Sequence, residues 1–284
     1  MDDLTQWAEW VGRRESVEDV IAPGPAERLA ATLGRREPTP RAGDALPPAW
    51  HWIYFLEATP RDGLADDGHA RRGGFLPPVT LPRRMWAGGR IAFERPLRIG
   101  EAVRRESEIL SITPKEGRSG RLVFVTVRHV ISGEDGPAVD EEHDIVYRHA
   151  PPPDAPLPQG KTPPADPKWR RVVEPDAALL FRFSALIFNA HRIHYDRDYV
   201  RDVEGYPGLL VHGPLTAILL LDLLRESCPD QTLRHFDYQA MAPLFDTAPF
   251  TVAGKANDGG AALWAETPDG KMAMGGTAKL ELIF

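Results

Sequence analysis

The stretch Gly208-Leu209-Leu210-Val211-His212-Gly213-Pro214 leads into the most apolar segment of the chain, which ends near Glu226 and decides the fold. This segment reads as a helix with almost no polar face. Such a helix must be buried on nearly all sides, and a curved antiparallel sheet wrapped around it would bury it in that way. The sequence therefore predicts an α+β fold organised around one buried helix.

The start of this helix is a candidate site for an oxyanion. Pro214 suits the first helical position, and Gly213 precedes it. Free backbone N–H groups at a helix N-terminus carry a partial positive charge and could polarise a carbonyl that becomes enolate-like. Gly213 would let a ligand approach the backbone closely. The alternative is an ordinary helix start.

A second polar cluster lies upstream, in Phe183-Ser184-Ala185-Leu186-Ile187-Phe188-Asn189-Ala190-His191-Arg192-Ile193-His194-Tyr195-Asp196. His194 could act as a general base or acid near neutral pH, whereas Asn189 could orient water but cannot take a proton. His191 and His194 would share one helix face, a spacing that could hold a metal. Because no third ligand is evident nearby, we expect no metal. A structural role for either histidine is the alternative to catalysis.

The chain divides into two halves of similar size. Residues 150–168 hold eight prolines and almost no apolar side chains, which indicates an extended linker. We place an N-terminal domain at 1–150, the linker at 151–168 and a C-terminal domain at 169–284. In each half, helical segments precede alternating strands separated by glycine-containing turns. This order suggests an internal duplication in which only the C-terminal half keeps the chemistry.

Three consecutive segments of the N-terminal half carry separate predictions. The apolar run 51–56 is typical of a buried strand, and the long Gly- and Pro-rich segment 57–82 is of a kind that is often functional. The third segment follows directly and reads Pro82-Arg83-Arg84-Met85-Trp86-Ala87-Gly88-Gly89. Two arginines beside Trp86 could bind a phosphate or a nucleotide ring. Spacing alone favours the alternative, a solvated turn.

Composition excludes several classes of function. The formal charge of −7 argues against non-specific nucleic-acid binding, which needs a basic face. The single cysteine, Cys228, cannot form an intramolecular disulfide, and a packing role is expected for it. The N-terminal residues lack the apolar core of a signal peptide, and the longest apolar run is too short to span a bilayer. We therefore expect a soluble, cytoplasmic protein that binds neither nucleic acid nor membrane.

The upstream cluster resembles the active-site loop of the MaoC-like hydratase/dehydratase family of hot-dog proteins. In that family, the pattern Asp-x-Asn-Pro-φ-His, with φ apolar, supplies an Asp and a His that activate water together. His194 and Ile193 match the last two positions. Asn189 stands where the Asp belongs, His191 where the Asn belongs, and Arg192 where the Pro belongs.

Three segments, 82–89, 188–196 and 206–214, are together similar to one branch of that family. The branch contains mesaconyl-C4-CoA hydratase, itaconyl-CoA hydratase and mitochondrial-type 3-hydroxyacyl-thioester dehydratase. The resemblance covers most of the chain and implies a double hot-dog fold, with two antiparallel sheets each wrapped around a long helix. It also implies that the N-terminal domain is non-catalytic and helps to shape the tunnel for the acyl group. No cofactor or metal is implied, and we expect a homodimer.

The resemblance implies reversible hydration of a 2-enoyl-CoA to a 3-hydroxyacyl-CoA. The preferred substrate is a branched C5 dicarboxylic acyl-CoA such as mesaconyl-C4-CoA or itaconyl-CoA. Gly213 N–H would polarise the thioester carbonyl, while His194 would deprotonate water and return a proton to the α-carbon. Asn189 would position the water, and His191 would assist. The candidate substrate-binding residues are Arg83, Arg84, Trp86, His212 and Arg192, and Arg192 ranks first for a substrate carboxylate.

Three alternatives stay open. The same site could serve a 3-hydroxyacyl-thioester dehydratase of fatty-acid metabolism. A hot-dog acyl-CoA thioesterase would use the same helix start but direct water at the carbonyl carbon. A non-catalytic acyl-CoA-binding subunit is the third alternative, because Asn189 replaces the family Asp and leaves His194 as the only clear base on the loop. Asp196 is a poor substitute for the missing acid, because it follows His194.

Overall fold

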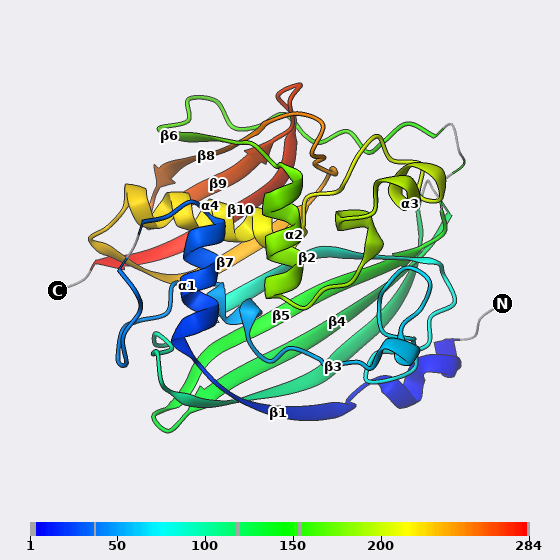
Figure 1. Ribbon diagram of the computed structural model, residues 1–284, viewed down its shortest axis with the longest axis horizontal. Coiled ribbons are helices and arrows are strands. Elements are labelled where there is room, and N and C mark those ends of the chain that lie inside the picture. The colour runs from blue at the N-terminus through cyan, green and yellow to red at the C-terminus, as the bar shows by residue number, and fades with distance from the viewer. Residues whose placement is uncertain (1–3, 37, 118–119, 151, 153–154, 283–284) are drawn as a thin grey trace.

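The computed structural model describes residues 4–36, 38–117, 120–150, 152 and 155–282, and its strands form one ten-stranded sheet (Figure 1). Neighbouring strands run antiparallel in the order β1-β3-β4-β5-β2-β7-β10-β9-β8-β6. The strands are β1 Arg14–Val20, β2 Arg83–Phe93, β3 Ala102–Gly117, β4 Gly120–Gly133, β5 Gly136–Arg148, β6 Trp169–Val173, β7 Gln231–Ala240, β8 Phe250–Asn257, β9 Gly260–Glu266 and β10 Met272–Leu282. The α-helices are α1 Pro23–Thr32, α2 Ala177–Leu186, α3 Arg197–Asp202 and α4 Gly213–Ser227. The α+β class predicted from the sequence is confirmed.

Strands β2 and β7 join the two halves of the sheet edge to edge. They pair from Gly88 opposite Gln239 to Ala92 opposite His235. A Cβ at Gly88 would lie 2.4 Å from the carbonyl oxygen of Tyr238, so glycine is what lets the two backbones approach this closely. Strands β1 to β5 precede the proline-rich segment, and β6 to β10 follow it.

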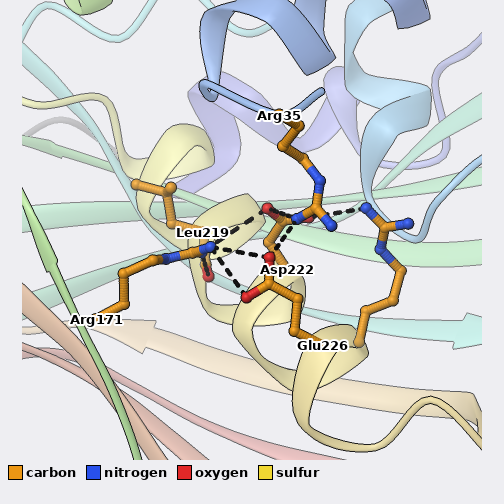
Figure 2. A network of polar contacts seen from close by, with 6 residues as sticks. Arg35, Arg171, Leu219, Asp222 and Glu226 are labelled. Atoms are coloured by element: carbon orange, nitrogen blue, oxygen red, sulfur yellow. Dashed lines mark hydrogen bonds and ion pairs between the residues drawn. The ribbon is translucent and has the colours of Figure 1, made fainter. Parts of the chain in front are cut away.

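The buried helix predicted from the sequence is α4, which packs against β6, β7, β8 and β9. Every residue from Leu215 to Leu224 is buried, because the sheet of the C-terminal half curves around the helix (Figure 1). Asp222 is the charged member of this run, with a side chain only 2% exposed. Arg35, which follows α1 in the chain, pairs with Asp222 and also bonds Glu226 at 2.9 Å (Figure 2).

A second arginine reaches the same helix from the sheet. Arg171 of β6 donates to the carbonyl oxygen of Leu219 at 3.1 Å and lies 3.8 Å from Asp222 (Figure 2). The network therefore ties α4 both to its own sheet and to the N-terminal half of the chain.

Two predictions made for the N-terminal half are wrong. The run 51–56 is not a strand, because the 3₁₀ helix Trp50–Ile53 occupies its first half, following Ala49 in a left-handed conformation. A short apolar run is compatible with either structure. The segment 83–89 is not a turn, because β2 begins at Arg83 and pairs with β5 from its first residue.

Two shorter elements complete the N-terminal half. One is a 3₁₀ helix, Leu4–Trp10, which precedes β1. The segment 57–82 contains the short 3₁₀ turn Arg61–Gly63 and is otherwise irregular. Among the described helices, none is both long and apolar enough to cross a membrane.

Candidate active site

The loop after α2 is shaped by Asn189. Phe188 has a positive φ of 50°, which turns the chain away from the helix. The Asn189 N–H then donates to the Ser184 carbonyl oxygen at 2.8 Å, and its own Oδ1 accepts from the His191 N–H at 2.9 Å. This is the Asx-turn geometry that an Asp or an Asn can supply equally well. The loop therefore keeps its shape without the family carboxylate.

His194 is held in one tautomer. Its Nδ1 donates to the Leu210 carbonyl oxygen at 2.8 Å, so Nδ1 carries the proton and Nε2 keeps its lone pair. The Leu210 N–H returns a bond to the Ile193 carbonyl oxygen at 3.0 Å, which fixes the loop to the segment before α4. Burial lowers the pKa of His194 to about 4, although the bond to Leu210 opposes this. His194 is therefore a neutral acceptor at neutral pH.

His212 connects this base to the start of α4. The rings of His194 and His212 stack with centroids 3.6 Å apart, and His212 is the residue that precedes the helix. Its Nε2 is 2.8 Å from Ser184 Oγ, and burial lowers its pKa well below the ordinary value. The first intrahelical bond of α4 is donated by Thr216 N to His212 O, so the amides of Gly213 and Leu215 have no partner within the helix. His194 and the helix N-terminus therefore lie side by side.

A carboxylate reaches the site from the segment 57–82. Asp67 Oδ2 accepts from His69 Nδ1 at 3.0 Å, and Asp67 Oδ1 accepts from the His69 N–H at 2.9 Å. The His69 ring lies 3.9 Å from that of His191, which in turn lies 5.6 Å from His194, centroid to centroid. The Arg192 N–H donates to the Asp67 carbonyl oxygen at 2.9 Å and docks this segment on the loop. Sequence reasoning missed Asp67 and His69.

Electrostatics keep Asp67 charged and the histidines neutral. Burial raises the pKa of Asp67, but the hydrogen bonds from the ring and the backbone N–H of His69 outweigh it and leave that pKa well below the usual range. Burial lowers the pKa of His69, and burial together with the neighbouring His69 lowers the pKa of His191 to about 2. Asp67 opposes both shifts, so it favours the protonated form of either ring when a proton arrives.

The same three residues could also hold a cation. Ligand atoms of Asp67, His69 and His191 all lie within 4.8 Å of one another. The sequence offered no third ligand beside His191 and His194, whereas the structure supplies two from a distant segment. Neutral imidazole and carboxylate are ligands that divalent transition metals accept.

Comparison with known proteins identifies the family. The family model described as hydroxyacyl-thioester dehydratase type 2 matches residues 49–246. This chain belongs to that family. It is 50% identical over 277 residues to mesaconyl-C(4)-CoA hydratase of Chloroflexus aurantiacus, covering 96% of this chain and 98% of that protein. The hydratase/dehydratase class predicted from the sequence is thereby confirmed, and the protein is a hydro-lyase.

Solved structures show the fold independently. A MaoC-like dehydratase superposes with a TM-score of 0.71 at 14% identity, covering 98% of this chain and 100% of that one. A Mycobacterium tuberculosis protein described as having a double hotdog fold superposes with a TM-score of 0.58 at 14% identity, covering 95% of this chain and 96% of that one. The double hot-dog prediction is confirmed.

The predicted substrate-binding arginines of this hydro-lyase lie in three different settings. Arg192 is turned outward, where its guanidinium bonds Asp196 at 2.8 Å and covers the Tyr199 ring at 4.2 Å. Arg83 is anchored to Glu204 through an ion pair of 3.1 Å. Arg84 lies close enough to His69 and His191 to lower the pKa of both rings. Of the three arginines, Arg84 is the one whose charge acts on both His69 and His191.

Trp86 covers the start of α4. A Cβ on Gly213 would lie 2.9 Å from the Trp86 ring, so the missing side chain makes room for the indole rather than open space for a ligand. The Trp86 ring also lies 5.1 Å from His143 and 4.9 Å from Trp52, centroid to centroid. Trp86 therefore borders both the helix N-terminus and a cavity that extends into the N-terminal half.

Proposed function

We propose that this protein hydrates a branched C5 dicarboxylic 2-enoyl-CoA, with mesaconyl-C4-CoA as the first candidate. The observation that carries the chemistry is the stack of His194 on His212, which sets a neutral base beside the N-terminus of α4. The substrate class rests on the similarity to mesaconyl-C(4)-CoA hydratase.

In this mechanism, the helix N-terminus binds the thioester carbonyl. The partial positive charge of the Gly213 and Leu215 amides lowers the free energy of the enolate-like state. His194 Nε2 takes a proton from water, the hydroxide adds at the β-carbon, and a proton is returned to the α-carbon. No cofactor enters this sequence.

Asp67 takes over the electrostatic role of the family Asp. It does not replace that carboxylate on the loop, where Asn189 retains the turn. Asp67 acts from the segment 57–82, through His69 and His191, whose protonated forms it favours. Arg84, whose charge acts on both rings, is our candidate for the phosphates of CoA. We further propose a cytoplasmic homodimer.

The test is hydration of mesaconyl-C4-CoA, itaconyl-CoA and crotonyl-CoA, followed by loss of enoyl-thioester absorbance in buffer with and without EDTA. We expect turnover of at least one dicarboxylic substrate, with no change on adding EDTA. Turnover of crotonyl-CoA alone would assign the protein to fatty-acyl dehydration. Release of free thiol without hydration would make it a thioesterase, and binding without turnover would make it a non-catalytic subunit. A loss of activity in EDTA would assign a metal to Asp67, His69 and His191.

The pH dependence of hydration is expected to follow His194. Only the neutral imidazole can accept the proton of water, and burial lowers its pKa to about 4. We expect kcat/KM to be flat from about pH 6 to 8 and to fall as the pH falls through the pKa of His194. An acid limb with a midpoint near 6.5, the ordinary value for histidine, would contradict a buried neutral base.

Stability must be followed in the same buffers. Because the buried histidines have pKa values below that of a free histidine, the unfolded chain binds more protons below about pH 6.5. The free energy of unfolding is therefore expected to decrease as the pH is lowered through this range. Far-UV circular dichroism will separate loss of fold from loss of the base.

Replacing Gly68 by alanine is expected to lower kcat for hydration by about 100-fold. Gly68 has a φ of +88°, and a Cβ there would lie 1.8 Å from the Ala190 carbonyl oxygen. Since that oxygen belongs to the catalytic loop, the segment with Asp67 and His69 must move away from His191.

Gly73→Ala is the matched control. Gly73 lies in the same segment with a φ of +95°, but its Cβ would meet only the Pro78 side chain at 3.7 Å. Both variants thus carry backbone strain, and only Gly68→Ala carries the clash. Equal activities of the two variants would show that the docking of Asp67 and His69 is not needed.

A further inference from the structure

The inner face of the N-terminal half-sheet carries a band of polar side chains between two apolar cores. Its inward positions read Val103-Arg105-Ser107-Ile109 on β3, Val127-His129-Ile131 on β4 and Val139-Glu141-His143-Ile145 on β5. Val103, Ile131 and Val139 belong to the main core, whereas Ile109, Val127 and Ile145 belong to a second core. We call Arg105, Ser107, His129, Glu141 and His143 the inner polar band.

These residues are neighbours across the strands. Ser107 pairs with His129, and His129 pairs with Glu141. His129 Nδ1 is 2.9 Å from Ser107 Oγ, and the Glu141 carboxylate accepts from Trp52 Nε1 at 3.0 Å and contacts His51 Nε2 at 3.0 Å. Ser107 and Glu141 are 1% and 3% exposed, so the band lies inside the protein. Burying polar groups in a sheet costs free energy unless they find partners.

The band holds donors whose partners are missing within the described part of the chain. Arg105 Nε and His143 Nε2 are enclosed and form no hydrogen bond there. The guanidinium of Arg105 has Glu15 at 3.7 Å, which is a weak ion pair. Burial lowers the pKa of His129 to about 3 and also lowers that of His143, so the charged groups of the band are Arg105 and the Glu141 carboxylate. His51 and Trp52 already hold Glu141, whereas Arg105, among the residues that the structure describes, has only the weak ion pair with Glu15. Arg105 is therefore the group of the band that is left to bind an incoming anion.

A cavity of about 190 Å³ lies against the band. It is lined by Arg105, His129, Glu141 and His143 of the band, and also by Trp86 and Pro214. Pro214 belongs to the first turn of α4, so the cavity begins beside the proposed thioester site. Its volume is little more than the roughly 150 Å³ of a cavity that holds benzene, which suits a short acyl group rather than a long alkyl chain.

We propose that this cavity binds the distal carboxylate of a short dicarboxylic acyl thioester, with Arg105 as the residue that selects it. The inference rests on the proposed hydration and moves the carboxylate from Arg192 on the loop after α2 to the interior of the N-terminal half. His129, His143 and Trp86 line the same cavity, and Pro214 at the start of α4 lines it too, so a carboxylate bonded to the β-carbon can lie here while the thioester carbonyl stays near the helix N-terminus.

The test compares Arg105→Gln with wild type on mesaconyl-C4-CoA and crotonyl-CoA, which lacks the distal carboxylate. We expect kcat/KM for the dicarboxylic substrate to fall by about 30-fold or more, since truncating one partner of a buried charge pair is costly. For crotonyl-CoA we expect a change within about threefold, and Arg105→Lys should restore part of the dicarboxylic activity. Equal losses on both substrates, or no loss on either, would overturn the proposal.

Arg128→Gln is the matched control. Arg128 lies on neighbouring β4 but is 45% exposed and pairs with Asp140, so it should leave both activities unchanged. If Arg105→Gln does not fold, wild-type enzyme decides the question with the distal methyl ester of mesaconyl-C4-CoA. Retained kcat/KM for the ester would overturn the carboxylate site, and a loss of about 30-fold or more would support it.

A binding measurement keeps this inference separate from the hydration chemistry. Methylsuccinyl-CoA has the same distal carboxylate but no double bond to hydrate, and Trp86 and Trp52 border the cavity. We expect it to change tryptophan fluorescence with a Kd that Arg105→Gln weakens by about 30-fold or more. Butyryl-CoA should show no such dependence on Arg105. Tight binding that needs Arg105, without turnover of any enoyl-CoA, would sustain the carboxylate site and reject the hydration proposal.

Discussion

Replacing His194 by glutamine is expected to lower kcat for hydration by about 10²- to 10⁴-fold, the usual contribution of a positioned general base. Glutamine can still donate to the Leu210 carbonyl oxygen, which holds the loop, but it cannot accept a proton from water. The buried environment that lowers the pKa of His194 also excludes bulk water, so hydroxide from solvent is a poor substitute. The measurement is kcat and KM for mesaconyl-C4-CoA, with the melting temperature as a check on folding.

Two further variants make the result specific. His191→Gln should lower kcat less than His194→Gln does. The ring that stacks on His212, the residue before α4, is that of His194. In the proposed mechanism His191 acts on the proton only after His194 has taken it from water. His235→Gln is the control, since His235 lies on β7 and is bonded to Asp237 at 3.1 Å, away from the loop. If His194→Gln keeps kcat within about threefold of wild type, a different group must be the base.

The C-terminal half could be predicted well because its signals are local. The helix α4 follows from one apolar segment with Pro214 near its start, and the hairpins follow from the turns at Gly259 and Gly270, where φ is positive. Strand β1 was missed for the opposite reason. It is an edge strand whose residues alternate between exposed and half-buried, so it carries charge instead of the apolar alternation that marks a strand.

The candidate site was predicted only in part, because part of it is assembled from distant segments. The loop with Asn189, His191 and His194 could be found from spacing and family resemblance. Asp67 and His69 could not, since no local pattern marks them, and the one available signal was the unusual length of the segment 57–82. The role given to Arg192 stays a prediction, and the sequence spacing did not show that its guanidinium pairs with Asp196 four residues later.

The inner polar band also could not be predicted from the alternation of apolar and polar residues along the strands. Strands β3 to β5 have apolar residues on both faces, so an Arg, a His or a Glu within them could equally face solvent. Only the register with neighbouring strands shows that Ser107, His129 and Glu141 meet on the enclosed face. A functional site built across strands is therefore found from topology, whereas one built on a single loop can be found from sequence.

Replacing Asp222 by alanine is expected to lower the free energy of unfolding by about 3 kcal/mol, near the low end of the range for a broken buried ion pair. Its carboxylate is 2% exposed and meets the guanidinium groups of Arg35, Arg171 and Arg225 (Figure 2). The low end is expected because these arginines are 14%, 29% and 36% exposed and keep some contact with water. Urea unfolding, followed by tryptophan fluorescence, measures the change.

Glu226→Ala is the matched control, because Glu226 bonds the same Arg35 and Arg171 but is 45% exposed. Removing an exposed ion-pair partner of this kind should lower the free energy of unfolding by less than about 1 kcal/mol. A double-mutant cycle of Arg35→Ala with Asp222→Ala then isolates the contact between the N-terminal half and α4. If Asp222→Ala costs no more than Glu226→Ala, the attachment of α4 must come from apolar packing alone. If the coupling is strong, the same contact that stabilises the chain also fixes the helix whose N-terminus faces the proposed thioester site.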